Sequence, residues 1–285
     1  MKKLHRIFAL IPAAAILVAS VIGFSAASIF YSNGAYYTLI NNYQASLTGW
    51  DTEISTVVTV PGVLNGRAVT DVDRYAFYED TTITGVDFSE ANNLTTIGMY
   101  AFSNCSALNS PVILPESITE IDDCAFESSA VTEAEINFSA KIPNQCFNRC
   151  GNLTEVRING AVTEIGTYAF ANCPNLTAVY LPDTVTTIPN SAFKNDPNLT
   201  IYCYADSYAQ QYAEARDIPY VLIQTYEVGD VDRDGTLSIT DVTLIQKYLA
   251  ELEMFDDEQL RLADFSADGQ VDIADATAIQ ITIAE

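Results

Sequence analysis

Two acidic loops near the C-terminal end of the chain contain the residues best suited to bind a metal ion. The first loop reads D-V-D-R-D-G-T-L-S-I-T-D from Asp230 to Asp241, and the second reads D-F-S-A-D-G-Q-V-D-I-A-D from Asp264 to Asp275. Each loop has oxygen-bearing side chains at positions 1, 3, 5, 9 and 12 and a glycine at position 6. Hard cations such as calcium prefer oxygen ligands, and calcium-binding loops place them at this spacing. The glycine allows the sharp turn around the ion. The spacing therefore predicts two calcium ions.

Position 7 of each loop is expected to offer its backbone carbonyl, and the other positions their side-chain oxygens. The predicted ligands of the first loop are Asp230, Asp232, Asp234, Thr236, Ser238 and Asp241. Those of the second loop are Asp264, Ser266, Asp268, Gln270, Asp272 and Asp275. Ser266 stands at position 3, where an Asp or Asn is usual, so the second site is expected to be the weaker of the two.

The two loops belong to an internal duplication with an offset of 34 residues (264 − 230). Asp230–Glu251 and Asp264–Glu285 are identical at 10 of 22 aligned positions, which argues against the alternative of a simple acidic turn. An EF-hand pair is the nearest competitor. Residues Tyr220–Val228, before the first loop, are β-branched and aromatic and predict a strand where an EF-hand has a helix. Position 12 is also Asp, where an EF-hand has Glu.

A duplicated unit of a calcium loop and one exiting helix resembles a type I dockerin, which binds a cohesin domain on a scaffoldin. The resemblance covers residues 229–285 and implies a small all-α domain with two calcium loop-helix units. It places cohesin recognition at loop positions 10 and 11 and on the following helix. The corresponding residues here are Ile239, Thr240 and Lys247 in the first copy and Ile273, Ala274 and Ile281 in the second.

The composition excludes several classes of protein. The single histidine, His5, lies in a segment expected to be removed, so histidine-dependent triads and His-ligated metal sites are excluded from the mature chain. Loss of Lys2, Lys3 and Arg6 from 13 Lys+Arg leaves a mature charge of 10 − 37 = −27. A surface this acidic argues against nucleic acid or an anionic membrane as a partner.

The first residues have the pattern of a secretory signal peptide. Basic residues precede an apolar run from Ile7 to Phe24 and a small-x-small site at Ser25–Ala27. This pattern predicts a leader at residues 1–27, cleaved after Ala27, and a protein that is secreted or attached to a bacterial cell surface through a scaffoldin. An uncleaved anchor is the alternative, because the run approaches membrane-spanning length.

A repeating unit accounts for most of the chain between the leader and the acidic loops. A small residue followed by Phe recurs at intervals of 21 to 25 residues, and periods of this size predict a leucine-rich-repeat solenoid. The phenylalanines are Phe77, Phe102, Phe126, Phe147, Phe170 and Phe193. The unit from Ile165 to Pro182 resembles the BspA-like (Treponema-type) leucine-rich repeats of bacterial surface proteins.

The expected fold is a leucine-rich-repeat solenoid, mainly β, with parallel strands stacked in a short curved coil, joined to the all-α dockerin. The expected segments are a β cap at residues 28–62, the solenoid with its C-terminal cap at 63–221, a linker at 222–228 and the dockerin at 229–285. One outward residue per strand is expected to form a ligand face. These residues are Asp87, Ile113, Glu135, Arg157 and Tyr180.

All six cysteines lie in or beside the repeats. Cys105, Cys150 and Cys173 each follow a repeat phenylalanine by three residues and are expected to form a buried column of free thiols. A Cys150–Cys173 disulfide is the alternative, because adjacent turns of a solenoid lie close together.

These features predict a secreted, non-catalytic component of a cellulosome-like complex. Its dockerin would attach it to a cohesin, and its repeats would bind an unknown protein or glycan of a cell surface or plant wall. A dockerin-borne glycoside hydrolase is one alternative, which would need two carboxylates flanking a sugar-sized cleft. A free-standing adhesin or calcium sensor is another.

Overall fold

The computed structural model of the protein describes residues 29–224 and 226–284. The expected leader, residues 1–27, lies outside these described residues. The chain splits into two compact units, Met1–Val179 with Thr184–Leu199, and Tyr180–Asp183 with Thr200–Glu285. No helix within the described residues has the length and apolar character needed to cross a bilayer.

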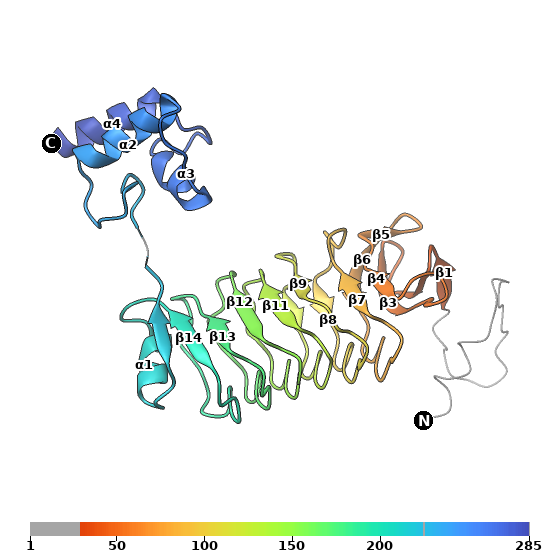
Figure 1. Ribbon diagram of the computed structural model, residues 1–285. Helices are drawn as coiled ribbons and strands as arrows, with labels where there is room; N and C mark the ends of the chain where they lie inside the picture. Colours follow the sequence, from red (N-terminus) through yellow and green to blue (C-terminus); the bar gives the residue numbers. More distant parts are fainter. Residues whose placement is uncertain (1–28, 225, 285) are drawn as a thin grey trace, which may run out of the picture. The chain divides into compact units, whose positions relative to one another are not determined.

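The repeats are built from short strands and the C-terminal part from helices (Figure 1). The strands are β1 (Phe30–Ser32), β2 (Ala35–Leu39), β3 (Gln44–Trp50), β4 (Val57–Thr59), β5 (Val63–Leu64), β6 (Arg67–Val72), β7 (Gly85–Asp87), β8 (Thr96–Ile97), β9 (Val112–Leu114), β10 (Glu120–Ile121), β11 (Glu133–Ile136), β12 (Glu155–Ile158), β13 (Ala178–Tyr180), β14 (Thr200–Cys203) and β15 (Tyr220–Leu222). The helices are α1 (Tyr208–Glu214), α2 (Ile239–Leu249), α3 (Asp257–Ala263) and α4 (Ile273–Ala284).

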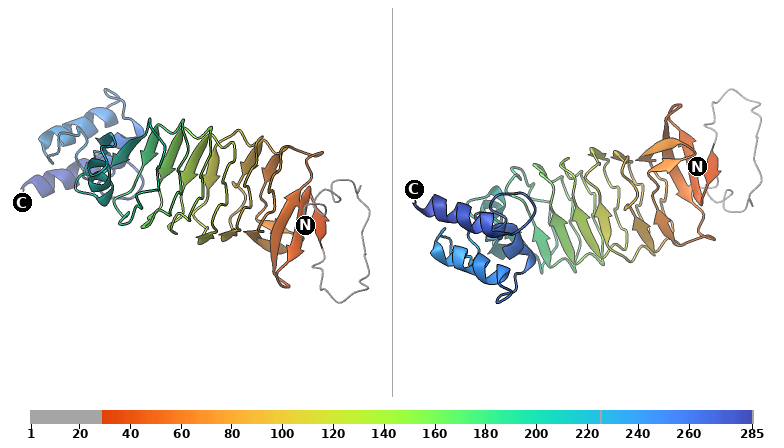
Figure 2. Two further views of the ribbon diagram at one scale, coloured as in Figure 1. Left: turned by 90° about the horizontal axis from the view of Figure 1, so that it is seen from below. Right: turned by 90° about the horizontal axis from the view of Figure 1, so that it is seen from above.

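Successive coils stack through parallel pairing of their short strands, which confirms the predicted solenoid. One sheet has the strand order β15-β14-β13-β12-β11-β9, and the other has the order β1-β2-β3-β6-β8-β10 with β5 paired to β6. Views from two further sides show the same stacking of successive coils (Figure 2). Within β11 the buried residues Ala134 and Ile136 alternate with Glu135, as the period of a half-buried strand requires.

The strands before the first coil form an antiparallel cap. β1 pairs with β2 and β2 with β3, whereas β3 pairs in parallel with β6 of the first coil. The cap buries Ala35, Tyr37, Ala45 and Leu47 at no more than 2% exposure. It therefore covers the apolar end of the repeats, which would otherwise be open to water.

The six repeat phenylalanines form one continuous stack. Successive ring centroids are 5.0–5.6 Å apart and the rings are within 9° of parallel. The backbone supports this register. The N–H of Phe102, for example, donates to the carbonyl of Ala125, the residue before the next phenylalanine. The residues two before and two after most of these phenylalanines have positive φ, as in Tyr100 (58°) and Asn104 (59°).

The cysteines are free thiols and all six are buried, which agrees with the expected column. Each of the three in-phase thiols donates to the carbonyl of a phenylalanine in the preceding coil. Cys105 Sγ lies 3.1 Å from Phe77 O, and Cys173 Sγ lies 3.2 Å from Phe147 O. Cys150 makes the same contact with Phe126 O at 3.2 Å. The thiol therefore satisfies a buried carbonyl as well as filling space.

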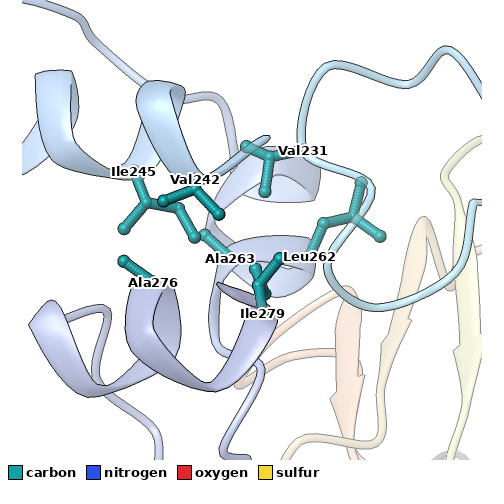
Figure 3. Close-up of a cluster of buried hydrophobic side chains, with 7 residues drawn as sticks. All are labelled: Val231, Val242, Ile245, Leu262, Ala263, Ala276 and Ile279. Atoms are coloured by element: carbon teal, nitrogen blue, oxygen red, sulfur yellow. The ribbon is translucent and has the colours of Figure 1, made fainter. Parts of the chain in front are cut away.

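The three helices that follow Thr225 share a small core (Figure 3). α2 contributes Val242 and Ile245, α4 contributes Ala276 and Ile279, and α3 contributes Leu262 and Ala263, with Val231 of the first acidic loop among them. Helices α2 and α4 each follow an acidic loop, as the duplication predicts. Their apolar faces pack on each other, so neither unit of the duplication would bury its core alone.

Denatured protein should contain six titratable thiols per chain before any reductant is added. A thiol reagent added to the unfolded chain under non-reducing conditions measures this number directly. A value of four would contradict the free column, and mapping of the linked peptides would then identify the pair, with Cys150–Cys173 as the first candidate.

Asp196 occupies the same position in the last of these coils as the cysteines do in earlier coils, and it gives a pH prediction. Its side chain is 9% exposed, Oδ1 accepts the Cys173 N–H at 2.7 Å, and Oδ2 has no partner in the described residues. Desolvation raises the pKa of this carboxyl from 3.8 to about 7. The folded state therefore favours the protonated form, whose stabilising effect is complete below pH 3.8 and is lost as the pH rises to about 7.

Asp196→Asn should remove this loss, because the amide keeps the acceptor oxygen without a buried charge. We expect the variant to be more stable than the wild type by about 1–2 kcal/mol at pH 8 and to differ little at pH 4. Denaturant unfolding of the repeats at both pH values, with calcium constant, measures the difference. Asp183→Asn, which changes an exposed acid, is the control. An equal effect of the two substitutions at pH 8 would contradict the prediction.

Candidate functional site

The first acidic loop gathers three carboxylates around one point. Asp230, Asp232 and Asp234 each place one oxygen within 4.8 Å of the others. Asp230 is buried and its two oxygens accept the N–H groups of Asp234 at 3.1 Å and Gly235 at 2.9 Å. Gly235 has a φ of 85°, which allows the loop to turn back on Asp230. A cation at this point would offset the repulsion between the three like charges.

Asp241 holds the two ends of this loop together. It is fully buried, and Oδ1 accepts the N–H groups of Val231 at 2.7 Å and Asp232 at 3.0 Å. Oδ2 accepts the Ser238 N–H at 2.8 Å, which forms a capping box at the start of α2. Asp241 is thus not one of the three clustered carboxylates, and both of its oxygens accept N–H groups of the loop backbone. Thr236 and Ser238 also take part in bonds within the loop, since the Thr236 N–H donates to Asp234.

The second loop repeats this hydrogen-bond pattern. Asp264 accepts the N–H groups of Asp268 at 3.0 Å and Gly269 at 2.9 Å. Asp275 is fully buried and accepts the N–H groups of Ser266 and Asp272, each at 2.8 Å. Burial acts to raise the pKa of Asp275, but these backbone donors outweigh it and the pKa is lowered.

The second loop differs from the first in its number of clustered acids. Within the part of the chain that the structure describes, the group of Asp230, Asp232 and Asp234 is the one set of three His, Cys, Asp or Glu side chains close enough to share an ion. Ser266 replaces the middle acid of that set in the second loop. Gln270 donates its N–H to Asp268 at 2.9 Å, and Asp272 accepts from the Ala274 N–H at 2.6 Å.

Helix α3, which was not predicted from the sequence, also supports the first loop. Its capping box joins Asp256 to Gln259, a D-x-x-Q signal that is visible in the sequence. Gln259 Nε2 donates to Val231 O at 3.3 Å, and the Gly229 N–H donates to Leu262 O at 2.8 Å. Arg233 of the loop forms an ion pair with Asp256. Helix α3 and its N-cap therefore contact the first loop both at its start, near Gly229 and Val231, and at Arg233.

The predicted recognition residues lie on the surface of α2 and α4. Ile239 and Ile273, at the start of the two helices, are each 60% exposed. The other four residues are exposed as well, namely Thr240, Lys247, Ala274 and Ile281. The first set combines a hydroxyl and a cation with its isoleucine, whereas the second set is entirely apolar.

The expected ligand face of the repeats is partly continuous. Ile113, Glu135 and Arg157 are direct neighbours across β9, β11 and β12. Tyr180 stacks on Tyr202 of β14, with ring centroids 4.3 Å apart. Asp87 lies on β7, which pairs with β4 in a separate two-stranded sheet. Tyr202 was not among the residues predicted for this face, although its strand follows the same alternation.

Comparison with known families assigns both parts of the chain. Residues 70–200 match the BspA type leucine rich repeat region in 6 copies, and residues 228–283 match the dockerin type I domain. The chain carries BspA-type leucine-rich repeats followed by a type I dockerin. Type I dockerins bind calcium in general, and a dockerin implies a cohesin partner. The repeats and the dockerin together support a cellulosome-type module for cohesin binding, and domains of these two kinds are non-catalytic.

Solved structures of bacterial leucine-rich-repeat proteins are also similar to this chain. The T. pallidum leucine rich repeat protein TpLRR has 22% identity over 61% of this chain and 71% of that chain, with a TM-score of 0.43. A leucine-rich repeat protein from Eubacterium ventriosum ATCC 27560 has 26% identity over 59% of this chain and 45% of that chain, with a TM-score of 0.47. Both TM-scores are below 0.5, so the assignment rests on the family match. No curated protein was found to match the chain.

Asp230→Asn should weaken calcium binding to the first loop by about tenfold or more, because one of three clustered charges is lost. Calcium titration by calorimetry measures the change. Asp257→Asn, which removes the same charge from an exposed position in the first turn of α3, is the matched control and should leave the affinity unchanged. Equal affinities for the two variants would contradict the assignment of Asp230 as a ligand.

Proposed function

We propose that this chain is a secreted, non-catalytic component of a cellulosome-like complex, which attaches through its dockerin to a scaffoldin cohesin and presents its repeats to a ligand. The observation that carries the proposal is the duplicated loop-helix unit, in which Asp241 and Asp275 play the same part. In both copies the fully buried position-12 carboxylate ties the loop backbone to the start of the following helix. This agrees with the type I dockerin match.

Two calcium ions would stabilise the dockerin. The first would bind at the cluster of Asp230, Asp232 and Asp234, with Thr236, Ser238 and Asp241 as further ligands. The second would bind at Asp264, Ser266, Asp268, Gln270, Asp272 and Asp275. Four carboxylates in each loop repel one another when no cation is present, so the free energy of calcium binding becomes free energy of folding. Loss of calcium would therefore separate α2 from α4 and disrupt the surface that they share.

The proposed cohesin surface consists of Ile239, Thr240 and Lys247 in the first copy and Ile273, Ala274 and Ile281 in the second. Their exposure supports this role, because an interface needs side chains that are not already used in the core. The two copies differ in chemistry. A cohesin that offers an acidic group would favour the copy with Lys247, and one with an apolar surface would favour the second copy.

The proposed ligand face of the repeats includes Ile113, Glu135 and Arg157 on neighbouring strands. Solenoids use such rows of outward side chains for binding, since the rigid stack holds them at fixed spacing. Tyr180 and its partner Tyr202 add an aromatic pair to β13 and β14. The neighbours of Glu135 across the strands are Ile113 and Arg157, so the row gives Glu135 no second carboxylate of the kind that a glycosidase needs.

Binding of the full chain to a panel of purified cohesins, with calcium and again with EDTA, tests the proposal. We expect capture by at least one cohesin in calcium and loss of capture in EDTA. Asp230→Ala should weaken capture because the first loop unfolds, and Asp257→Ala, an exposed change of equal charge, should not. Capture that persists in EDTA, or equal capture by both variants, would contradict the calcium-dependent mechanism. No capture by any cohesin would favour a free-standing adhesin.

A further inference from the structure

The first coils of the repeats contain a small cavity that the proposed function does not use. It has a volume of about 170 Å³ and lies beside β3, β6 and β8, in the sheet opposite the proposed ligand face. Polar side chains dominate its lining, which includes Ser46, Asp71, Asp73, Arg74, Thr96 and Asp122.

Two carboxyl groups of this cavity have acceptor atoms that the protein does not use. Asp73 Oδ1 accepts the Arg74 N–H at 2.8 Å, and Asp122 Oδ2 accepts the Met99 N–H at 3.2 Å. The second oxygen of each group has no protein donor among the described residues. Each carboxyl is thus fixed by the backbone and still able to accept a hydrogen bond from a hydroxyl group in the cavity.

Three tyrosines that lie within a few residues of the cavity lining in the chain form a partly exposed cluster. The rings of Tyr75 and Tyr100 stack with centroids 5.3 Å apart and an interplanar angle of 15°. Tyr78 meets both rings edge-on, at 5.5 Å and 6.0 Å. Tyr75 is 39% exposed and Tyr78 38% exposed, although packing among the three rings already covers part of each. The cluster offers rigid aromatic surface to the solvent.

The Met99 peptide joins the cavity to the tyrosines. Its N–H donates to Asp122 in the cavity, and its carbonyl accepts the Tyr75 N–H at 3.0 Å. Tyr75 follows Arg74 directly in the chain, and Tyr100 follows Gly98 of the cavity lining by two residues. The carboxyl acceptors and the aromatic surface therefore lie on adjoining residues of the same two coils.

We propose that this cavity and the three-tyrosine cluster form a binding site for an uncharged polysaccharide. Sugar hydroxyl groups donate to Asp73 and Asp122, and the C–H face of a neighbouring sugar packs on the exposed ring surface of Tyr75. The cavity is smaller than the roughly 300–1,000 Å³ of pockets for drug-sized ligands, so it suits one sugar ring of a longer chain. The formal charge of −24 and the acids of the cavity repel uronates and sulfated sugars. The inference rests on the proposed function, for which it names a ligand class and a second surface.

The test is calorimetric titration of the full chain, in calcium, with cellohexaose and mannohexaose as neutral probes and hexagalacturonate as the charged probe. The variants are Tyr75→Asn and Tyr100→Asn. Both positions have positive φ, 59° and 58°, and Asn tolerates this region better than most residues, so these variants should fold. Asp122→Asn tests the carboxyl group, since the amide oxygen can still accept the Met99 N–H.

Tyr168→Asn is the matched control. Tyr168 occupies the same position of its coil as Tyr75 and Tyr100, with a φ of 57° and 37% exposure, but it has no ring partner among the described residues. We expect one neutral hexasaccharide to bind the wild type and the control equally. It should bind each of the Tyr75, Tyr100 and Asp122 variants about tenfold more weakly or worse.

Cohesin capture by the same preparations separates this inference from the proposed function. Cohesin binding with no neutral hexasaccharide bound would overturn the sugar site and leave the dockerin role intact. Equal loss in the control, unchanged affinity in the Tyr75 and Tyr100 variants, or tighter binding of hexagalacturonate than of the neutral probes would also overturn it.

Discussion

Contact between successive coils is the constraint on which the repeats depend. One coil is too small to enclose its own apolar side chains, so each inner phenylalanine of the stack is buried by the phenylalanines before and after it. The same dependence explains the cap of β1, β2 and β3, which covers the first coil. Stacking also fixes the spacing of the exposed side chains, because outward residues on neighbouring strands are separated by the distance between coils. The surfaces proposed for ligands are consequences of this stacking.

The dockerin solves a similar problem with far fewer apolar residues. Its core of seven buried side chains is divided between two copies of one unit and helix α3. Buried carboxylates hold the loops in place where a larger protein would use a larger apolar core. Asp241 and Asp275 each accept backbone N–H groups from both ends of a loop. The metal-binding loops therefore also determine the fold, and their chemistry cannot be separated from the position of α2 and α4.

Regular spacing is what made much of this architecture predictable. The recurrence of phenylalanine predicted the solenoid, and the 34-residue offset predicted α2 and α4. Helix α3 was missed because it is seven residues long and has no counterpart in the repeat pattern. Asp87 was placed in the ligand row by strand alternation, but sheet membership depends on pairing and β7 pairs with β4. The cluster of Tyr75, Tyr78 and Tyr100 was also missed, since ring contacts between coils follow from loop conformation and not from strand periodicity.

The column of buried thiols has a consequence for the chemical durability of the protein. Burial raises the pKa of Cys105 and of Cys150 to about 12, and that of Cys124 to about 11. Only the thiolate attacks a disulfide or reacts quickly with oxidants, and a rise of three pKa units lowers its population about a thousandfold. The burial that lets these cysteines pack as apolar residues therefore also makes them slow to oxidise. The stacked coils would thus keep their reduced side chains under the oxidising conditions in which most proteins form disulfides.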